Sequence, residues 1–372
     1  MTSQKKQVIF VLNSNELDGP SRFIYELSLA LKNQFRVTVY VPIIPRYKLF
    51  VLQSCKNSGW LASLAKQIHY CFRWLTIDLV IRKLKWVKDI EGSVESKRCI
   101  FSPTQASLKT ADYVILSAWY HTLHFPQFWE SNKEKFVVCH WHYEDYRNRS
   151  IAGVRDKIVN ECQSITCSEN SSNSISSKRL RKPHVVSMGI NPNVFHPISR
   201  NYKTQDRSID ILLYRGFEKR KGFHIGLEAM QNISENFQLN CCVIQGSKRA
   251  KTPWDYPVHA ELSDEKLAQL LRDTNIFLYP SLLEGFGMPP LEAMACGCAV
   301  VTTRVGAVPD YTTHMVDAYV VDPGQVSQLE HAITFLLNNR DAMQKMQAKA
   351  ADKAVSYSWK AAALNLTNVL NV

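Results

Sequence analysis

The sequence predicts an α/β protein with two domains, each built around a parallel sheet. The chain has 372 residues, whereas a single hydrophobic core rarely serves more than about 300. Short apolar runs of strand length alternate with longer amphipathic runs of helix length. A polar, proline-containing stretch at 192–206 separates two such series. We therefore expect one domain over 1–197, a second over 198–355, and a cleft between them.

The first domain begins with a strand–helix–strand unit. Residues 8–13 form a short apolar run, residues 36–41 alternate between apolar and polar side chains, and an amphipathic stretch lies between them. A helix that joins two strands in this way implies that the strands run parallel. Further strands are predicted over 113–117, 136–139 and 164–168, and a basic, aromatic helix over 60–89.

The second domain repeats the alternation of strands and helices. Such alternation predicts an open, doubly wound sheet, in which ligands bind beyond the carboxyl ends of the strands. The strands are predicted over 210–214, 239–245, 276–279 and 299–303. The helices are predicted from about 223 onward and over 264–273, 289–296 and 326–338.

The loop Glu-Gly-Phe-Gly-Met-Pro-Pro-Leu-Glu at 284–292 follows one of these strands and leads into a helix. Its two prolines suit the first helical turn, and Gly297 suits a left-handed cap at the helix end. Its glycines let a ligand approach the backbone N–H groups, while Glu284 and Glu292 can accept hydrogen bonds from hydroxyls. A ligand with sugar hydroxyls at one end and ribose hydroxyls at the other fits this loop. The alternative is that the two glutamates only complement the helix start and its dipole.

A second loop concentrates positive charge in front of a predicted helix. A strand ends at Arg215, and Lys219, Arg220 and Lys221 precede the helix that starts near 223. Cations at a helix N-terminus oppose the helix dipole, so their presence indicates that an anion binds there. Arg215 and Lys221 are the candidates to hold a diphosphate. The alternative is a basic loop that is simply solvated.

Together, the two loops resemble those of retaining glycosyltransferases of family 4. The segment 284–297 is similar to that family's signature, and Arg215 with Lys221 is similar to its diphosphate-binding pair. The resemblance is strong over about 210–323, moderate at both chain ends and poor over about 45–111. It implies the GT-B fold, in which two Rossmann-like, doubly wound domains face each other across a cleft. It also implies a C-terminal helix, over about 356–372, that packs back on the first domain.

The resemblance implies roles for individual residues. Glu292 would hold the nucleotide ribose, and Glu284 would hold a hydroxyl of the donor sugar. Arg215 and Lys221 would neutralise the diphosphate leaving group, the main electrostatic task of the transition state. Gly19, after the first strand, would let the backbone approach the phosphates. The donor-binding loop is completed by Gly285, Phe286, Gly287 and Met288.

The resemblance also places a histidine of the first domain near the donor sugar. The run Phe-Val-Val-Cys-His-Trp-His-Tyr-Glu at 136–144 offers His140 and His142. The position at the strand end favours His140, which we take as the catalytic candidate, whereas the His-Tyr-Glu ending favours His142. The same histidines, with Glu144 and Asp145, suggest an alternative of another class, a metal-dependent hydrolase. No further cluster of metal ligands is evident in the sequence.

The implied reaction moves a hexose-type group from a nucleoside diphosphate sugar to a hydroxyl of a glycan or lipid-linked acceptor, with the anomeric configuration retained. We expect no metal and no other cofactor, because cationic side chains serve the phosphates and no Asp-x-Asp motif is evident. Polysaccharide biosynthesis is the expected setting. A catalytically inactive, nucleotide-sugar-binding relative is a further alternative.

The charge balance of 45 − 33 = +12 favours anionic partners. No zinc finger, helix-turn-helix or aromatic RNA-binding motif supports nucleic acid as that partner. The basic and aromatic residues of 60–89 would hold the protein at an anionic membrane surface, or would form a core helix with a solvated basic face. The sequence shows no signal peptide and no transmembrane run. We therefore expect a cytoplasmic protein, peripheral on the inner face of the membrane if the docking occurs.

Overall fold

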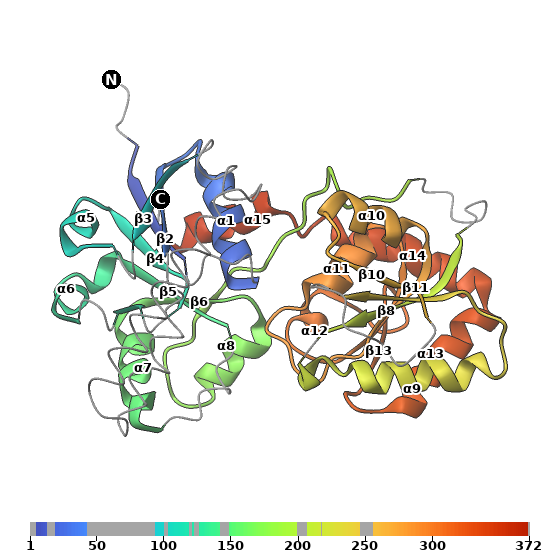
Figure 1. Ribbon diagram of the computed structural model, residues 1–372. Coiled ribbons are helices and arrows are strands. Elements are labelled where there is room, and N and C mark those ends of the chain that lie inside the picture. Colours follow the sequence, from blue (N-terminus) through green and yellow to red (C-terminus); the bar gives the residue numbers. More distant parts are fainter. Residues whose placement is uncertain are drawn as a thin grey trace, which may run out of the picture. The chain divides into compact units, whose positions relative to one another are not determined.

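The computed structural model describes residues 5–12, 19–42, 94–99, 103–118, 121–122, 126–141, 149–198, 207–216, 218–245 and 256–370. The predicted basic helix over 60–89 and His142 lie outside these residues. Contacts within the chain divide it into two compact units, each built on one sheet (Figure 1). The first unit comprises Met1–Thr166, Ser171–Val186 and Ala362–Val372, and the second comprises Cys167–Asn170 and Ser187–Ala361.

The first unit holds a seven-stranded, fully parallel sheet in the order β3-β2-β1-β4-β5-β6-β7. The chain runs from β1 outward to β3 and then returns to β4 beside β1, so the strand order reverses between β1 and β4. The strands are β1 (Gln7–Val11), β2 (Arg36–Pro42), β3 (Glu95–Cys99), β4 (Tyr113–Leu116), β5 (Phe136–His140), β6 (Gln163–Thr166) and β7 (His184–Val185). The helices are α1 (Gly19–Leu31), α5 (Gln105–Lys109), α6 (Pro126–Glu130), α7 (Arg149–Glu161) and α8 (Glu169–Ser176), with a short turn η2 (Lys133–Lys135).

The second unit holds a six-stranded, fully parallel sheet in the order β10-β9-β8-β11-β12-β13. Its order reverses between β8 and β11. The strands are β8 (Ile209–Arg215), β9 (Cys241–Gln245), β10 (Val258–Ala260), β11 (Thr274–Tyr279), β12 (Ala299–Thr303) and β13 (Tyr319–Val321). The helices are α9 (Phe223–Ser234), α10 (Asp264–Arg272), α11 (Met288–Ala295), α12 (Val308–Tyr311), α13 (Val326–Asn338) and α14 (Arg340–Ala354), with a short turn η3 (Lys219–Lys221). The last helix, α15 (Trp359–Val369), begins in this unit and continues into the first.

The core of each unit lies on both faces of its sheet. The strands β11 and β12 are buried at every residue, as expected for parallel strands covered by helices on both sides. Figure 1 shows α9 and α13 on one face of the second sheet, and α10, α11 and α14 on the other. Ile211 and Leu213 of β8 point to the first of these faces, where they pack with Ala229 and Ile333. The intervening Leu212 is also fully buried. The sheet edge, and not its faces, is therefore left for ligands.

The segment that precedes the predicted linker is fastened to the second unit. The Ile190 N–H donates to the Tyr357 carbonyl at 2.9 Å. At Gly189, a Cβ atom would lie 2.3 Å from the backbone nitrogen of Trp359, so the two backbones approach too closely for any side chain. The division between the units therefore falls after Val186, ahead of the boundary at 197 that the polar composition suggests.

The C-terminal helix α15 begins at Trp359, within the segment expected to form the final helix. Its residues from Ala362 onward group with the first unit. The Tyr113 hydroxyl of β4 donates to the Leu370 carbonyl at 2.7 Å, which ties the end of the chain to the first sheet.

The predicted α/β class with two parallel sheets is confirmed, and the strands expected from apolar runs are present. The strands β3, β7, β10 and β13 were not expected. The last three have only two or three residues and leave no periodic pattern, and β3 (ESKRC) has no apolar run. The Ser/Asn-rich segment at 169–177 carries no helix signal, yet most of it forms α8. Packing explains this helix: Ile175 is fully buried, and the Ser172 hydroxyl donates to the Pro183 carbonyl at 2.7 Å.

Candidate active site

The candidate site of the second unit lies at the carboxyl edge of its sheet, where the strand order reverses. At such a point the loops after the two neighbouring strands diverge to opposite faces, and they leave room for a ligand. The strands concerned are β8, which ends at Arg215, and β11, which ends at Tyr279. The basic loop and the glutamate loop follow these two strands, so the fold brings both predicted loops to one edge.

Glu284 is the centre of a buried hydrogen-bond network, with its side chain only 7% exposed. The Lys221 ammonium donates to Glu284 Oε1 at 2.7 Å and to Oε2 at 2.9 Å. Oε1 also accepts from the hydroxyls of Tyr279 at 2.6 Å and Ser281 at 2.7 Å. Burial of a carboxylate is unfavourable unless charge and hydrogen bonds compensate for the lost water, and these donors supply both.

The two oxygens of Glu284 differ in how many donors surround them. Oε1 has three donors, which saturate its lone pairs. Oε2 accepts from Lys221 alone within the described part of the chain, and the Arg220 guanidinium lies farther away at 3.6 Å. Oε2 therefore keeps the capacity to accept a hydrogen bond from a ligand hydroxyl.

Lys221 owes its position to two glycines. At Gly216 a Cβ atom would lie 2.2 Å from Lys221 Cγ, so only glycine leaves the space that the lysine stem occupies. Gly222 follows Lys221 in the left-handed conformation with φ of 62°, and a Cβ there would lie 1.9 Å from the Pro280 carbonyl oxygen. The ammonium uses two of its three N–H groups on Glu284, and the third meets no acceptor among the described residues.

Arg215 has partners different from those of Lys221. Its Nη1 donates to Gln245 Oε1 at 3.0 Å, and its guanidinium lies 5.3 Å from the centre of the Phe223 ring. Gln245 is almost fully buried and directly opposes Arg215 in the pairing of β8 with β9. The arginine is therefore held at the carboxyl edge by a neighbouring strand and by the start of α9.

The glycine-rich loop presents backbone donors in front of α11. Gly287 has a φ of 90° and precedes the first helical residue, Met288. Its carbonyl accepts from the Tyr311 hydroxyl at 2.8 Å, and the Phe286 ring packs against Tyr311. In the described structure, the N–H groups of Gly285, Phe286, Gly287 and Met288 make no hydrogen bond. Such groups at a helix N-terminus are suited to bind ligand oxygens.

Glu292 is buried on α11, 3% exposed, one helical turn after the start of that helix. The carboxylates of Glu284 and Glu292 thus both lie in this region, and their negative charge acts on the phenol of Tyr214 in β8. Burial, and then Glu284 and Glu292, raise the pKa of Tyr214 to about 12. Tyr214 therefore stays protonated at neutral pH.

In the first unit, the structure places Gly19 and His140 on elements at the carboxyl edge of the sheet. Gly19 is the first residue of α1 and not part of a free loop, and a Cβ atom there would meet nothing within 4 Å. His140 ends β5, and its Nε2 lies 3.2 Å from the Ser164 hydroxyl. The imidazole is 4% exposed, and burial, followed by the charge of Arg155, lowers its pKa to about 3. His140 is therefore a neutral, buried hydrogen-bonding group.

The metal-site alternative rests on His140 and residues outside the described ranges. Within those ranges, no cluster of three or more His, Cys, Asp or Glu side chains could hold a metal ion. His142, Glu144 and Asp145 are not among the described residues.

Three functional candidates were missed by sequence reasoning: Tyr279, Ser281 and Gln245. Tyr279 and Gln245 are the last residues of predicted apolar strands, and Ser281 lies two residues after β11. A polar side chain at the carboxyl end of a parallel strand is the signal that could have found them. Their partners could not be read from the sequence, because these depend on strand order.

The fold and the site together define a class of protein. The structure matches the GT-B fold, as in the structure of HepE from Anabaena in complex with UDP and glucose, with a TM-score of 0.72 and 12% identity. That match covers 99% of this chain and 100% of the other. Residues 195–353 match the family model for glycosyl transferases group 1, so the second unit carries the sequence features of that family.

Curated relatives support the same group. An uncharacterised glycosyltransferase of Methanocaldococcus jannaschii is 26% identical over 42% of this chain and 46% of its own length. An MMP α-(1→4)-mannosyltransferase of Mycolicibacterium hassiacum is 28% identical over 48% of this chain and 46% of its own length. The match spans about half the length of these relatives. No helix in the described ranges combines the length and the apolar character that crossing a membrane requires.

Proposed function

We propose that the chain is a retaining glycosyltransferase. It transfers a hexose-type group from a nucleoside diphosphate sugar to a hydroxyl of a glycan or lipid-linked acceptor, and it needs no divalent cation. The observation that carries this proposal is the pairing of Lys221 with Glu284 at the edge where the strand order reverses. Such a sugar donor carries phosphates, hydroxyls and further oxygens. The site offers a cation for the phosphates, a carboxylate with spare acceptor capacity for a hydroxyl, and backbone N–H groups for the other oxygens.

The geometry lets Lys221 and Glu284 act on the donor at the same time. The third N–H of the ammonium binds a phosphate oxygen, while the other two keep the carboxylate in place. Glu284 Oε2 accepts from a sugar hydroxyl, while Tyr279 and Ser281 hold Oε1. The donor therefore needs no rearrangement of the network in order to bind.

The remaining predicted residues complete the donor site. Arg215 forms a second cationic contact with the diphosphate, with Gln245 setting the direction of its guanidinium. The N–H groups from Gly285 to Met288 bind sugar or phosphate oxygens, and Glu292 binds the nucleotide ribose. In the first unit, Gly19 keeps the start of α1 clear for the phosphates.

The chemical step follows from these contacts. The bond between the anomeric carbon and the diphosphate oxygen breaks, and the bond to the acceptor oxygen forms on the same face of the sugar. The acceptor proton passes to the departing phosphate oxygen. Lys221 and Arg215 stabilise the negative charge that develops on the leaving group, which is the largest contribution expected from the protein.

The relatives support a hexose donor. HepE is described in complex with UDP and glucose, and the Mycolicibacterium hassiacum relative is a mannosyltransferase. The neutral imidazole of His140 suits a hydrogen bond to a sugar hydroxyl, and His142 is the alternative for this contact. Comparison of turnover in His140→Gln and His142→Gln distinguishes them, because the variant with the larger loss identifies the histidine near the sugar.

Nucleotide binding is the first test of the proposal. Thermal shifts are measured with UDP, GDP, dTDP and ADP, with and without EDTA, on the wild type and on Lys221→Gln and Glu292→Gln. One nucleotide should stabilise the wild type and not the two variants, and EDTA should change nothing. Lys219→Gln is the matched control, since Lys219 is exposed on the same turn and should retain the shift. Absence of any nucleotide shift would exclude the proposed function.

A further test concerns stereochemistry. The anomeric configuration of the first product, read by NMR against that of the donor, should be unchanged. An inverted product would refute the retaining mechanism and leave nucleotide-sugar binding intact.

A further inference from the structure

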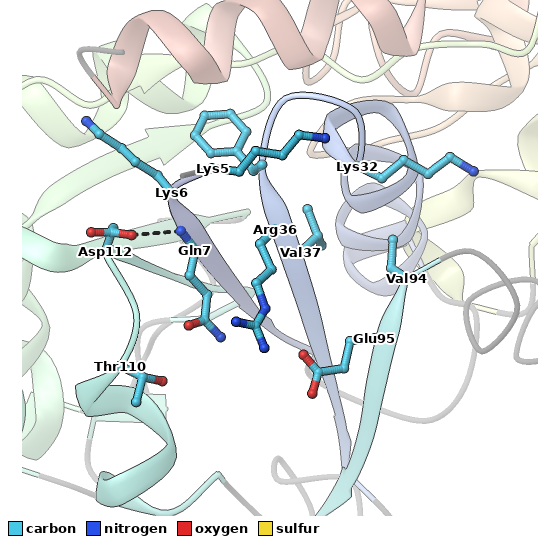
Figure 2. A pocket seen from close by; sticks show the side chains of 11 residues that line it. Lys5, Lys6, Gln7, Lys32, Arg36, Val37, Val94, Glu95, Thr110 and Asp112 are labelled. Atoms are coloured by element: carbon cyan, nitrogen blue, oxygen red, sulfur yellow. Dashed lines mark hydrogen bonds between the residues drawn. The ribbon is translucent and has the colours of Figure 1, made fainter. Parts of the chain in front are cut away.

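A cavity of about 740 Å³ opens at the amino edge of the first sheet (Figure 2). Its lining comes from the starts of β1, β2 and β3, from the residue after α1, and from the connection between α5 and β4. All the strands of this sheet run parallel, so the amino edge lies at the opposite end from His140. The cavity is therefore separate from the site described above.

Positive charge dominates the lining. Four cationic side chains, Lys5, Lys6, Lys32 and Arg36, contribute to it, against the carboxylates of Glu95 and Asp112. This composition alone does not define a site, because helices that end at this edge also attract cations. Two helices, α1 and α5, end here, and each contributes about half a negative charge.

Both carboxylates are already engaged. Asp112 Oδ2 accepts from the Gln7 backbone N–H at 2.7 Å. Glu95 accepts from the Thr38 hydroxyl at 2.7 Å and from the Lys97 ammonium at 2.9 Å. Lys97 does not line the cavity, so Glu95 has a cation of its own. These contacts hold the pKa of Glu95 below its usual value, with the Lys97 hydrogen bond as the main cause. Glu95 thus has a cation outside the lining and Asp112 a backbone donor, and the four cations of the lining outnumber these two carboxylates.

The cations of the lining form no close ion pair within the described part of the chain, although the charge of Arg36 acts on Glu95. In the described ranges, no carboxylate lies within 4.0 Å of the charged nitrogens of Lys5, Lys32 or Arg36, and the Lys6 ammonium lies over the Tyr113 ring at 5.6 Å. Figure 2 shows the Arg36 side chain reaching into the cavity between Gln7 and Glu95. A guanidinium in that place offers a planar pair of N–H donors toward the cavity.

We propose that this cavity binds a phosphate monoester group. The Arg36 guanidinium binds two phosphate oxygens, and Lys5 and Lys32 add positive charge at the rim. The Gln7 amide and the Thr110 hydroxyl supply neutral hydrogen bonds to the rest of the ligand. The volume exceeds that of a phosphate and falls in the range of small-molecule sites, so the phosphate is carried by a larger group. A soluble phosphate ester and the headgroup of phosphatidic acid share this chemistry.

Glycerol 3-phosphate is the probe, because it is a soluble phosphate ester and also the headgroup of phosphatidic acid. Its binding to the full chain is measured by calorimetry for the wild type, Arg36→Gln and Lys109→Gln. Lys109 is exposed near the same edge but does not line the cavity, so it is the matched control. Loss of Arg36 should weaken binding roughly tenfold, whereas Lys109→Gln should bind as the wild type does. Absence of binding to the wild type, or equal weakening by both substitutions, overturns the proposal.

Phosphate could instead occupy the donor site, and Lys221→Gln separates the two sites. Binding that persists in this variant and fails in Arg36→Gln supports the cavity, and the reverse pattern overturns the proposal. Hydrogen exchange needs no substitution: the ligand should slow exchange in the segments that hold Gln7 and Arg36. Exchange that slows only near Lys221 overturns the proposal without any question of misfolding.

Vesicles distinguish the two sources of the phosphate. Phosphatidylcholine vesicles containing phosphatidic acid are compared with vesicles that carry phosphatidylglycerol at equal surface charge. Binding to soluble glycerol 3-phosphate alone identifies a soluble ligand. Preferential binding to phosphatidic acid that Arg36→Gln abolishes identifies the lipid. The proposal is overturned if the protein binds both vesicle types equally, if Arg36→Gln does not change that binding, and if glycerol 3-phosphate does not bind.

Discussion

Replacement of Lys221 by methionine tests the network around Glu284 most directly. The substitution keeps an unbranched stem and removes the ammonium that donates to both carboxylate oxygens. The Glu284 carboxylate, 7% exposed, then keeps the hydroxyl donors Tyr279 and Ser281 and the more distant Arg220 guanidinium at 3.6 Å. Removal of one partner of a buried ion pair costs about 3–5 kcal/mol. Because Lys221 is 17% exposed and two donors remain, we expect the free energy of unfolding to fall by roughly 2–3 kcal/mol.

A double-mutant cycle turns this expectation into a measurement. Glu284→Gln removes the carboxylate charge, and the double variant removes both charges. The two single variants lose stability, and the sum of their losses should exceed the loss of stability in the double variant by a coupling free energy of about 2 kcal/mol. Hydrogen exchange of the β8 and β11 amides reports the second unit alone, which matters because two units need not unfold together. Lys219→Met, an exposed neighbour, should change stability by less than about 0.5 kcal/mol. Additive losses in the cycle would refute the reasoning, since they would mean that the ion pair stabilises nothing.

Three further changes have defined outcomes. Tyr279→Phe removes one hydrogen-bond donor to Glu284 and keeps the ring volume. Calorimetry should show that the affinity for the nucleotide sugar falls roughly tenfold. Unchanged affinity would contradict a role for the Tyr279 hydrogen bond in donor binding. Gly222→Ala places a Cβ 1.9 Å from the Pro280 carbonyl oxygen at a φ of 62°. The free energy of unfolding should therefore fall by at least about 2 kcal/mol, and the melting temperature should fall with it. A melting curve like that of the wild type would disprove the close approach. Burial and Arg155 lower the pKa of His140 from 6.5 to about 3. The unfolded chain therefore binds the proton first, and stability present above pH 6.5 is lost as the pH falls toward 3, by up to about 1.4 kcal/mol per pH unit. His140→Gln should flatten this dependence in urea titrations, and equal slopes would show that His140 is not buried as a neutral group.

Much of the local structure could be predicted from the sequence because it depends on short-range properties. Apolar runs located the long strands, since a parallel strand buried on both faces is apolar throughout. The prolines in the first turn of α11 and the left-handed Gly297 after its end were expected from the geometry of helix ends. Elements that depend on packing were missed: the strands β3, β7, β10 and β13, and α8, whose Ser/Asn-rich sequence has low helix propensity.

For the site, the sequence by itself determined which residue types lie at the ends of strands and in the loops and helix starts that follow them, and so identified Arg215, Lys221, Glu284 and Glu292 as candidates. Only the tertiary structure decided their partners. Lys221 and Glu284 are 63 positions apart and meet because β8 and β11 are neighbours in the sheet. Gln245 meets Arg215 because β9 lies on the other side of β8. Strand order follows from long-range packing of both sheet faces, which no local pattern encodes, so the hydrogen bonds that hold these side chains could be known only from the folded chain.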